Sequence, residues 1–159
     1  MDNEVIATVQ ASQPRRWLGV SMLVALGLLL IYLGVSAQSS AVIAKAAFLV
    51  FGGLCLWMAE NLRRATEHGI ELTDAGLRET TGAIIAPIDS IRAVDRGFMA
   101  FKPSNGFVVT LEAPGERAWR PGVWWRMGKR IGVGGVTAAS QTRFMADALK
   151  ALLVERDGT

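Results

Sequence analysis

Apolar residues run almost without interruption from position 17 to position 59, where the only charged side chain is Lys45. As a helix, "WLGVSMLVALGLLLIYLGV" (Trp17 to Val35) spans roughly 28 Å, close to the ~30 Å hydrocarbon layer of a bilayer. The second apolar run, Ala46 to Ala59, reaches a spanning length when its helix begins a few residues earlier. The pattern predicts a transmembrane helical hairpin over residues 17–62.

A cleaved signal peptide is the alternative interpretation of the first apolar segment, because such peptides also start with a basic region and an apolar run. Here the run is longer than the usual ~7–15 residues, and the region before it carries Asp2 and Glu4. A second apolar segment follows directly. We therefore expect both helices to be retained.

Cations flank the predicted hairpin unevenly. Two arginines, Arg15 and Arg16, precede it and two, Arg63 and Arg64, follow it, whereas the loop between the helices holds only one lysine. Because cytoplasmic segments carry the excess of Lys and Arg, both ends of the hairpin are expected to face the cytoplasm. The first 16 residues are then a cytoplasmic tail. Neither helix carries an acidic, His or Arg side chain in mid-span, which argues against a transporter or channel.

After the hairpin, the pattern changes to short runs separated by turn residues. "IELTD" and "GLRET" predict two strands joined at Ala75-Gly76, and "AIIAPI" predicts a third strand limited by Pro87. The spacing of Ile88, Ile91 and Val94 fits one helical turn leading into a strand. Farther on, "PSNG" is a hairpin signal before the β-branched run "FVVTLEA". These runs predict an antiparallel sheet in a domain covering residues 66–159.

The end of the chain predicts one amphipathic helix. Apolar residues recur there at every fourth position, and Thr137 or Ser140 is the expected N-cap. We expect this helix to close one end of a small β-sandwich or barrel, which makes the fold class α+β. The side chains assigned to the core are Phe144, Leu149 and Leu152.

The segment "IELTDAGLRETTGAIIAPIDSIRAVDRG" resembles the opening of bacterial pleckstrin-homology-like (PH-like) domains. In that family, a strand with a Thr-Asp turn and Gly-Leu leads through a Gly turn to an I-x-x-I step. Such domains often follow two transmembrane helices and end in one helix. The resemblance covers about residues 69–154 and implies a fold, not an activity. The basic first hairpin of phosphoinositide-binding members is not matched, because Arg78 stands beside Glu71, Asp74 and Glu79.

Residues that could support catalysis are sparse. His68 is the only histidine and Cys55, the only cysteine, lies in the apolar block, so neither a disulfide nor a zinc site is expected. Asp89 and Asp95 flank "SIRAV" and fit capping or pairing with nearby arginines better than acid–base chemistry. No nucleophile elbow, Walker A or H-E-x-x-H motif is present. We expect a protein that is not an enzyme and has no cofactor, metal or small-molecule substrate.

The stretch "RPGVWWRMGKRIGVGG" (residues 120–135) and the residues just before it concentrate tryptophans and cations. Its lysine precedes the glycines, so no phosphate-binding loop is formed. The net charge of +3 and the membrane tether argue against nucleic acid. Three interpretations stay open: anionic lipid, a docking hot spot for a protein, or tryptophans that fill the core while the cations are solvated. Because alternate strand positions face opposite sides, at most one ring of the Trp pair belongs to the core. The candidate contact residues are Arg117, Trp119, Arg120, Trp124, Trp125, Arg126, Lys129 and Arg130.

Together, these patterns predict a protein of the bacterial inner membrane with both termini in the cytoplasm. We expect a non-catalytic accessory subunit that docks on an integral membrane protein or complex. The alternative is a module that senses anionic membrane lipids, and a membrane-bound enzyme ranks third.

Overall fold

The computed structural model describes residues 4–36, 41–96 and 106–158. The chain forms two compact units. One is Gln13–Arg64, and the other joins the segments that precede and follow it in the sequence. The helical hairpin is therefore inserted in the sequence of the other unit. Residues 1–12, which the sequence pattern predicted to be part of a tail, belong to that unit.

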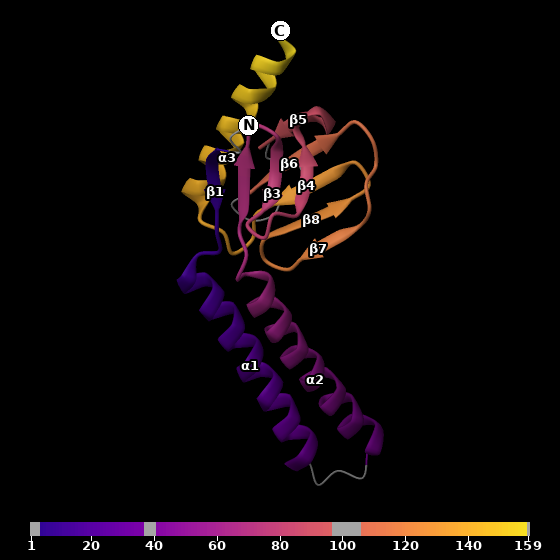
Figure 1. Ribbon diagram of the computed structural model, residues 1–159. Helices are drawn as coiled ribbons and strands as arrows, with labels where there is room; N and C mark the ends of the chain where they lie inside the picture. The colour runs from indigo at the N-terminus through magenta and orange to yellow at the C-terminus, as the bar shows by residue number, and fades with distance from the viewer. Residues whose placement is uncertain (1–3, 37–40, 97–105, 159) are drawn as a thin grey trace. The chain divides into compact units, whose positions relative to one another are not determined.

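The inserted unit consists of α1 (Gln13–Ser36) and α2 (Val42–Ala65), each long and apolar enough to cross a membrane. The two helices run antiparallel side by side (Figure 1). Glycines allow their backbones to approach, since a Cβ built on Gly27 would lie 3.0 Å from the carbonyl oxygen of Gly52. Close approach through small residues is a common way for helices to pack in a bilayer.

Four antiparallel strands form the first sheet, in the order β1 (Val5–Val9), β2 (Ile70–Thr73), β3 (Gly76–Glu79) and β4 (Ile84–Pro87). The last three match the predicted strands. β1 does not, because residues 1–16 were expected to be a tail.

The pairing of β1 with β2 constrains the topology of the whole chain. Val9 is fully buried and pairs with Ile70, although both helices lie between them in the sequence. Strands in one sheet must share a compartment. Any membrane crossed by α1 must therefore be crossed again by α2.

The second sheet has five antiparallel strands in the order β5-β6-β9-β8-β7. The helical turn predicted from Ile88, Ile91 and Val94 is shorter than expected: the 3-10 helix η1 covers Ile88–Ser90, and Ile91 and Val94 already lie in β5. The predicted "PSNG" turn lies almost entirely outside the described residues. The Trp-rich region, whose alternation is poor, forms three strands. The strand bounds are Ile91–Asp95 for β5, Phe107–Leu111 for β6, Ala118–Arg120 for β7, Trp124–Met127 for β8 and Arg130–Val133 for β9.

The C-terminal helix α3 (Ala139–Asp157) packs against β1, β5 and β6 (Figure 1). Leu149 is fully buried and Leu152 packs partly buried against the core, as predicted. Phe144 was wrongly assigned to the core, because it is 60% exposed. The N-cap is Ala138, without a side-chain hydrogen bond, rather than a threonine or serine.

The α+β layout predicted from the sequence is confirmed: two long apolar helices are joined to antiparallel sheets and a C-terminal helix. Among the described residues the strands form two separate sheets and no closed barrel. The side chains buried between the sheets and α3 include Ile70, Leu72, Phe107, Ile131, Met145 and Leu149.

Candidate binding surfaces

Two tryptophans stand side by side on the outer face of the second sheet. Trp119 in β7 is directly opposite Trp125 in β8, and cross-strand partners point to the same face. Trp119 is 58% exposed, whereas Trp125 is half-buried. The next residue in this row, Gly132 of β9, is covered by the indole of Trp125, and a Cβ at that position would collide with the ring. The glycine thus makes the space in which Trp125 lies.

The same face continues toward the β8–β9 turn. Met127 follows Trp125 by two positions and pairs with Arg130, so both share the face of the tryptophans. Met127 is 62% exposed, and Arg130 is exposed as well. Gly128 has a φ of 58°, a left-handed conformation that suits glycine at a tight turn. We call the set Trp119, Trp125, Met127 and Arg130 the outer Trp face.

Trp124 points the other way, into the core, and is only 7% exposed. Its indole Nε1 donates a hydrogen bond of 3.1 Å to Oε1 of Glu79 in β3, and Arg120 Nε donates to the same oxygen at 3.0 Å. Thr81 Oγ1 donates to the second carboxylate oxygen at 3.2 Å. We call Glu79, Arg120 and Trp124 the Glu79 clasp, because it joins the two sheets.

The ionisation of Glu79 reflects these donors. Burial of the carboxylate raises its pKa, but the hydrogen bonds from Arg120, Trp124 and Thr81 and the charge of Arg120 lower it more. The net result is a pKa below the ordinary glutamate value, so the Glu79 carboxylate is ionised at neutral pH.

Arg126 also has a structural role. Its Nη1 donates to the carbonyl oxygen of Ile85 in β4 at 3.0 Å, and its Nε donates to the carbonyl oxygen of Glu116 at 2.6 Å. Both acceptors are backbone groups, and one of them belongs to the opposite sheet. Arg126 therefore ties the sheets together and is not a freely solvated cation.

The remaining cations of the candidate set, Arg117, Lys129 and Arg130, are all exposed. Within the part of the chain that the structure describes, none of them forms an ion pair. The sequence-predicted site therefore divides into a structural part, Arg120, Trp124 and Arg126, and an accessible part. The accessible part is Arg117, Trp119, Lys129 and Arg130, with Trp125 half-covered.

A shallow hollow of about 340 Å³ opens beside the clasp, between the β3–β4 region and β7–β8. Its walls include Ile84, which is 73% exposed, and Trp119. Arg120 also lines it. Trp119 thus belongs to the outer Trp face and also lines this hollow.

Sequence reasoning overlooked Glu79 and Gly132. Glu79 follows the buried Leu77 by two strand positions, so period-two alternation places its carboxylate on the core side, where an acid requires partners. For Gly132, an isolated glycine within a β-branched strand is a signal of close approach by another group.

His68, Asp89 and Asp95 are exposed, and no group of acidic, His or Cys side chains that could hold a metal ion occurs among the described residues. Arg96 forms an ion pair of 3.1 Å with Asp147 in α3.

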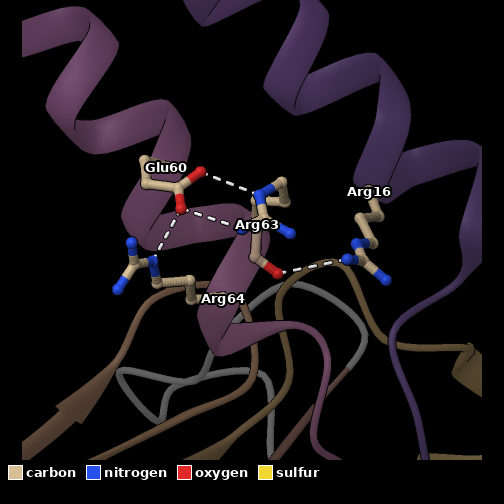
Figure 2. Close-up of polar contacts among 4 residues, drawn as sticks. All are labelled: Arg16, Glu60, Arg63 and Arg64. Carbon is tan, nitrogen blue, oxygen red and sulfur yellow. Dashed lines mark hydrogen bonds and ion pairs between the residues drawn. The ribbon is translucent and has the colours of Figure 1, made fainter.

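A second polar cluster lies at the base of the helical hairpin (Figure 2). The two oxygens of Glu60 accept from Nε and Nη2 of Arg63, both at 2.8 Å, and Arg64 Nε donates to Oε1 at 2.6 Å. Arg16 of α1 donates through Nη2 to the carbonyl oxygen of Arg63 at 3.2 Å. We call Arg16, Glu60, Arg63 and Arg64 the arginine cluster, which links the ends of the two helices.

No protein-family model, no curated protein and no solved structure matches this chain.

Proposed function

We propose that this protein is a membrane-anchored, non-catalytic accessory subunit that docks on an integral membrane protein through the outer Trp face. In this proposal, α1 and α2 hold the chain in a bacterial inner membrane with both termini in the cytoplasm. The sheet unit is a PH-like module that serves as a binding platform. The order of the elements and the arginines that flank the helices support this arrangement.

The observation that carries the proposal is the exposed pairing of Trp119 with Trp125 beside Met127 and Arg130. Trp, Met and Arg are enriched at protein interfaces, and Trp and Arg often dominate the binding energy. Trp125 is already fixed against Gly132, so less side-chain entropy is lost when a partner covers the face.

The tether to the helices favours a partner in the membrane. Only residues 10–12 separate β1 from α1, and only residues 66–69 separate α2 from β2. Segments of this length span at most roughly 10–15 Å. The amide of Ser12 also donates to the carbonyl oxygen of Val136 at 2.8 Å, so the first connector is itself bound to the sheet unit. The module therefore cannot move far from the bilayer.

The charges indicate the chemistry of the partner. Arg117 directly precedes β7, Lys129 lies in the turn after β8, and Arg130 directly follows that turn. All three are exposed and have no acidic partner among the described residues, so a complementary surface offers acidic groups beside an apolar centre. The hollow lined by Ile84 and Trp119 can accept one apolar side chain of that surface.

Site-specific photo-crosslinking in native membranes tests the proposal. A photo-reactive residue at position 119 or 127 should capture the same integral membrane protein, and Lys129→Gln with Arg130→Gln should weaken its capture. Position 144 is the matched control, because Phe144 is 60% exposed and Trp119 58%, but Phe144 lies on α3. Adducts with lipid alone would favour the lipid-sensing alternative. No adduct at either position, or equal capture at position 144, would contradict the proposed dock.

A further inference from the structure

The arginine cluster lies immediately beyond the apolar part of both helices. In α1, Arg16 directly precedes Trp17, where the apolar run begins. In α2, Glu60 follows Ala59, where the run ends, and Arg63 and Arg64 come within the next turn. If the helices span a bilayer, as the proposed function requires, the cluster lies at the depth of the lipid headgroups.

Arg64 has hydrogen-bond donors that the rest of the cluster does not use. The two oxygens of the Glu60 carboxylate accept from Arg63 and Arg64, whereas Arg16 donates to the carbonyl oxygen of Arg63 (Figure 2). The side chain of Arg64 is 71% exposed and binds Glu60 through Nε only. Its two Nη groups have no other hydrogen bond within the described residues, so they can donate to an external anion. Glu60 thereby holds Arg64 in one orientation while its outer donors stay accessible.

We infer that the arginine cluster binds the phosphate group of an anionic phospholipid. An arginine offers two parallel N–H donors that match a phosphate, and the outer donors of Arg64 are accessible for such a contact. Basic groups between helix ends on the cytoplasmic side are suited to anionic headgroups.

Neighbouring apolar residues favour a lipid over a free phosphate ion. Trp17 is 57% exposed and Leu18 is 62% exposed, both directly after Arg16 on α1. The Trp17 ring also lies 5.8 Å from the guanidinium carbon of Arg16, so an aromatic group borders the cation. A phospholipid can contact the arginines with its phosphate and these side chains with its acyl chains. A soluble phosphate would use the arginines alone.

The test measures lipid retention by the full-length protein. It is reconstituted with equal amounts of phosphatidylcholine and phosphatidylglycerol, and the lipids retained after mild detergent extraction are identified by native mass spectrometry. We expect selective retention of phosphatidylglycerol. Arg16→Gln combined with Arg64→Gln should lower the affinity roughly thirtyfold, whereas Arg143→Gln on α3, which removes an exposed cation elsewhere, should leave retention unchanged.

Two further measurements separate a built site from general attraction. Arg64→Lys keeps the charge but loses the paired donors, so retention should fall; retention equal to the natural protein would contradict the phosphate site. Inorganic phosphate added in excess should not displace the lipid, and displacement would assign the cluster to soluble anions.

Alkaline carbonate extraction is done before these measurements. A protein that is released from membranes would refute the proposed anchoring. A protein that stays inserted but retains both lipids equally would refute only this inference.

Discussion

The indole nitrogen of Trp124, in the second sheet, donates a hydrogen bond of 3.1 Å to Glu79 Oε1, in the first. Glu79 is only 6% exposed, and its other donors are Arg120 and Thr81. A buried carboxylate without hydrogen-bond donors would destabilise the folded state. The Glu79 carboxylate therefore depends on the donors that surround it. The polar contact between the sheets is thus built from residues that are far apart in the sequence.

The stability of the sheet unit should depend on the ionisation of Glu79. Because its pKa is lowered in the folded state, the carboxylate stabilises the fold above the unfolded-state pKa of about 4.5. This contribution is lost as the pH falls below that value and through the lower folded-state pKa. Urea unfolding of the full-length protein in detergent, at about pH 7 and about pH 3, measures it. Glu79→Gln should unfold more easily at neutral pH, by about 1–3 kcal/mol, and lose less stability on acidification.

Arg126 and Arg130 should respond differently to the same substitution. Arg126→Gln removes charged hydrogen bonds to the carbonyl oxygens of Ile85 and Glu116, so the free energy of unfolding should fall by about 1.5–3 kcal/mol. Arg130→Gln alters an exposed side chain and should change it by less than about 0.5 kcal/mol. Thermal unfolding of both variants decides the matter, and equal effects would mean that Arg126 is solvated.

Gly132 should tolerate a side chain only when Trp125 is removed. Gly132→Ala forces the indole of Trp125 from its position and should destabilise the sheet unit by about 1–3 kcal/mol. In a double-mutant cycle, Gly132→Ala should cost much less in a Trp125→Ala background, because no ring is left to collide with. Additive costs would show that the ring does not occupy this space in solution.

Leu149 and Phe144 provide a matched pair on α3. Leu149→Ala deletes a fully buried side chain and should cost about 2–5 kcal/mol, whereas Phe144→Ala removes a side chain that is 60% exposed and should cost far less. Hydrogen exchange of the β6 amides in the full-length protein reports both values. A large effect at Phe144 would indicate that the helix is covered on its other side.

Reporter fusions test the proposed orientation. Alkaline phosphatase should be active when fused after Ala41, between the helices, and inactive when fused after Gly158. The β1–β2 pairing adds a stronger requirement, because fusions at the two ends of the chain must agree with each other. Activity at one end only would contradict the pairing itself.

Much of the sheet unit follows local patterns and could be predicted. The strands around Ile70, Leu77 and Phe107 alternate or are β-branched, and their turns contain glycine. The opposite orientation of Trp124 and Trp125 also follows from strand geometry and is confirmed by their burial.

The missed features depend on contacts between distant segments. β1 is a five-residue strand, and its partner β2 follows only after two helices. No residue pattern near Val9 therefore predicts that β1 pairs with β2. The acceptor of Arg126 is a backbone carbonyl 41 positions away, and any residue at Ile85 would supply it. Such contacts leave no local pattern, which is why the sequence places Arg126 among the candidate contact residues and not among the structural ones.

The placement of β1 has a consequence for biosynthesis. β1 leaves the ribosome before both helices but cannot complete its sheet until residues 10–69 and then β2 have been made. With the hairpin in a bilayer, α2 returns the chain to the side of the membrane on which β1 lies. The antiparallel helices then bring Val9 and Ile70 together at little further cost in chain entropy. If α2 fails to insert, the two strands are left on opposite sides of the membrane and the buried face of β1 stays open to water. If the helices span a membrane, correct insertion of α2 is therefore a precondition for folding of the sheet unit.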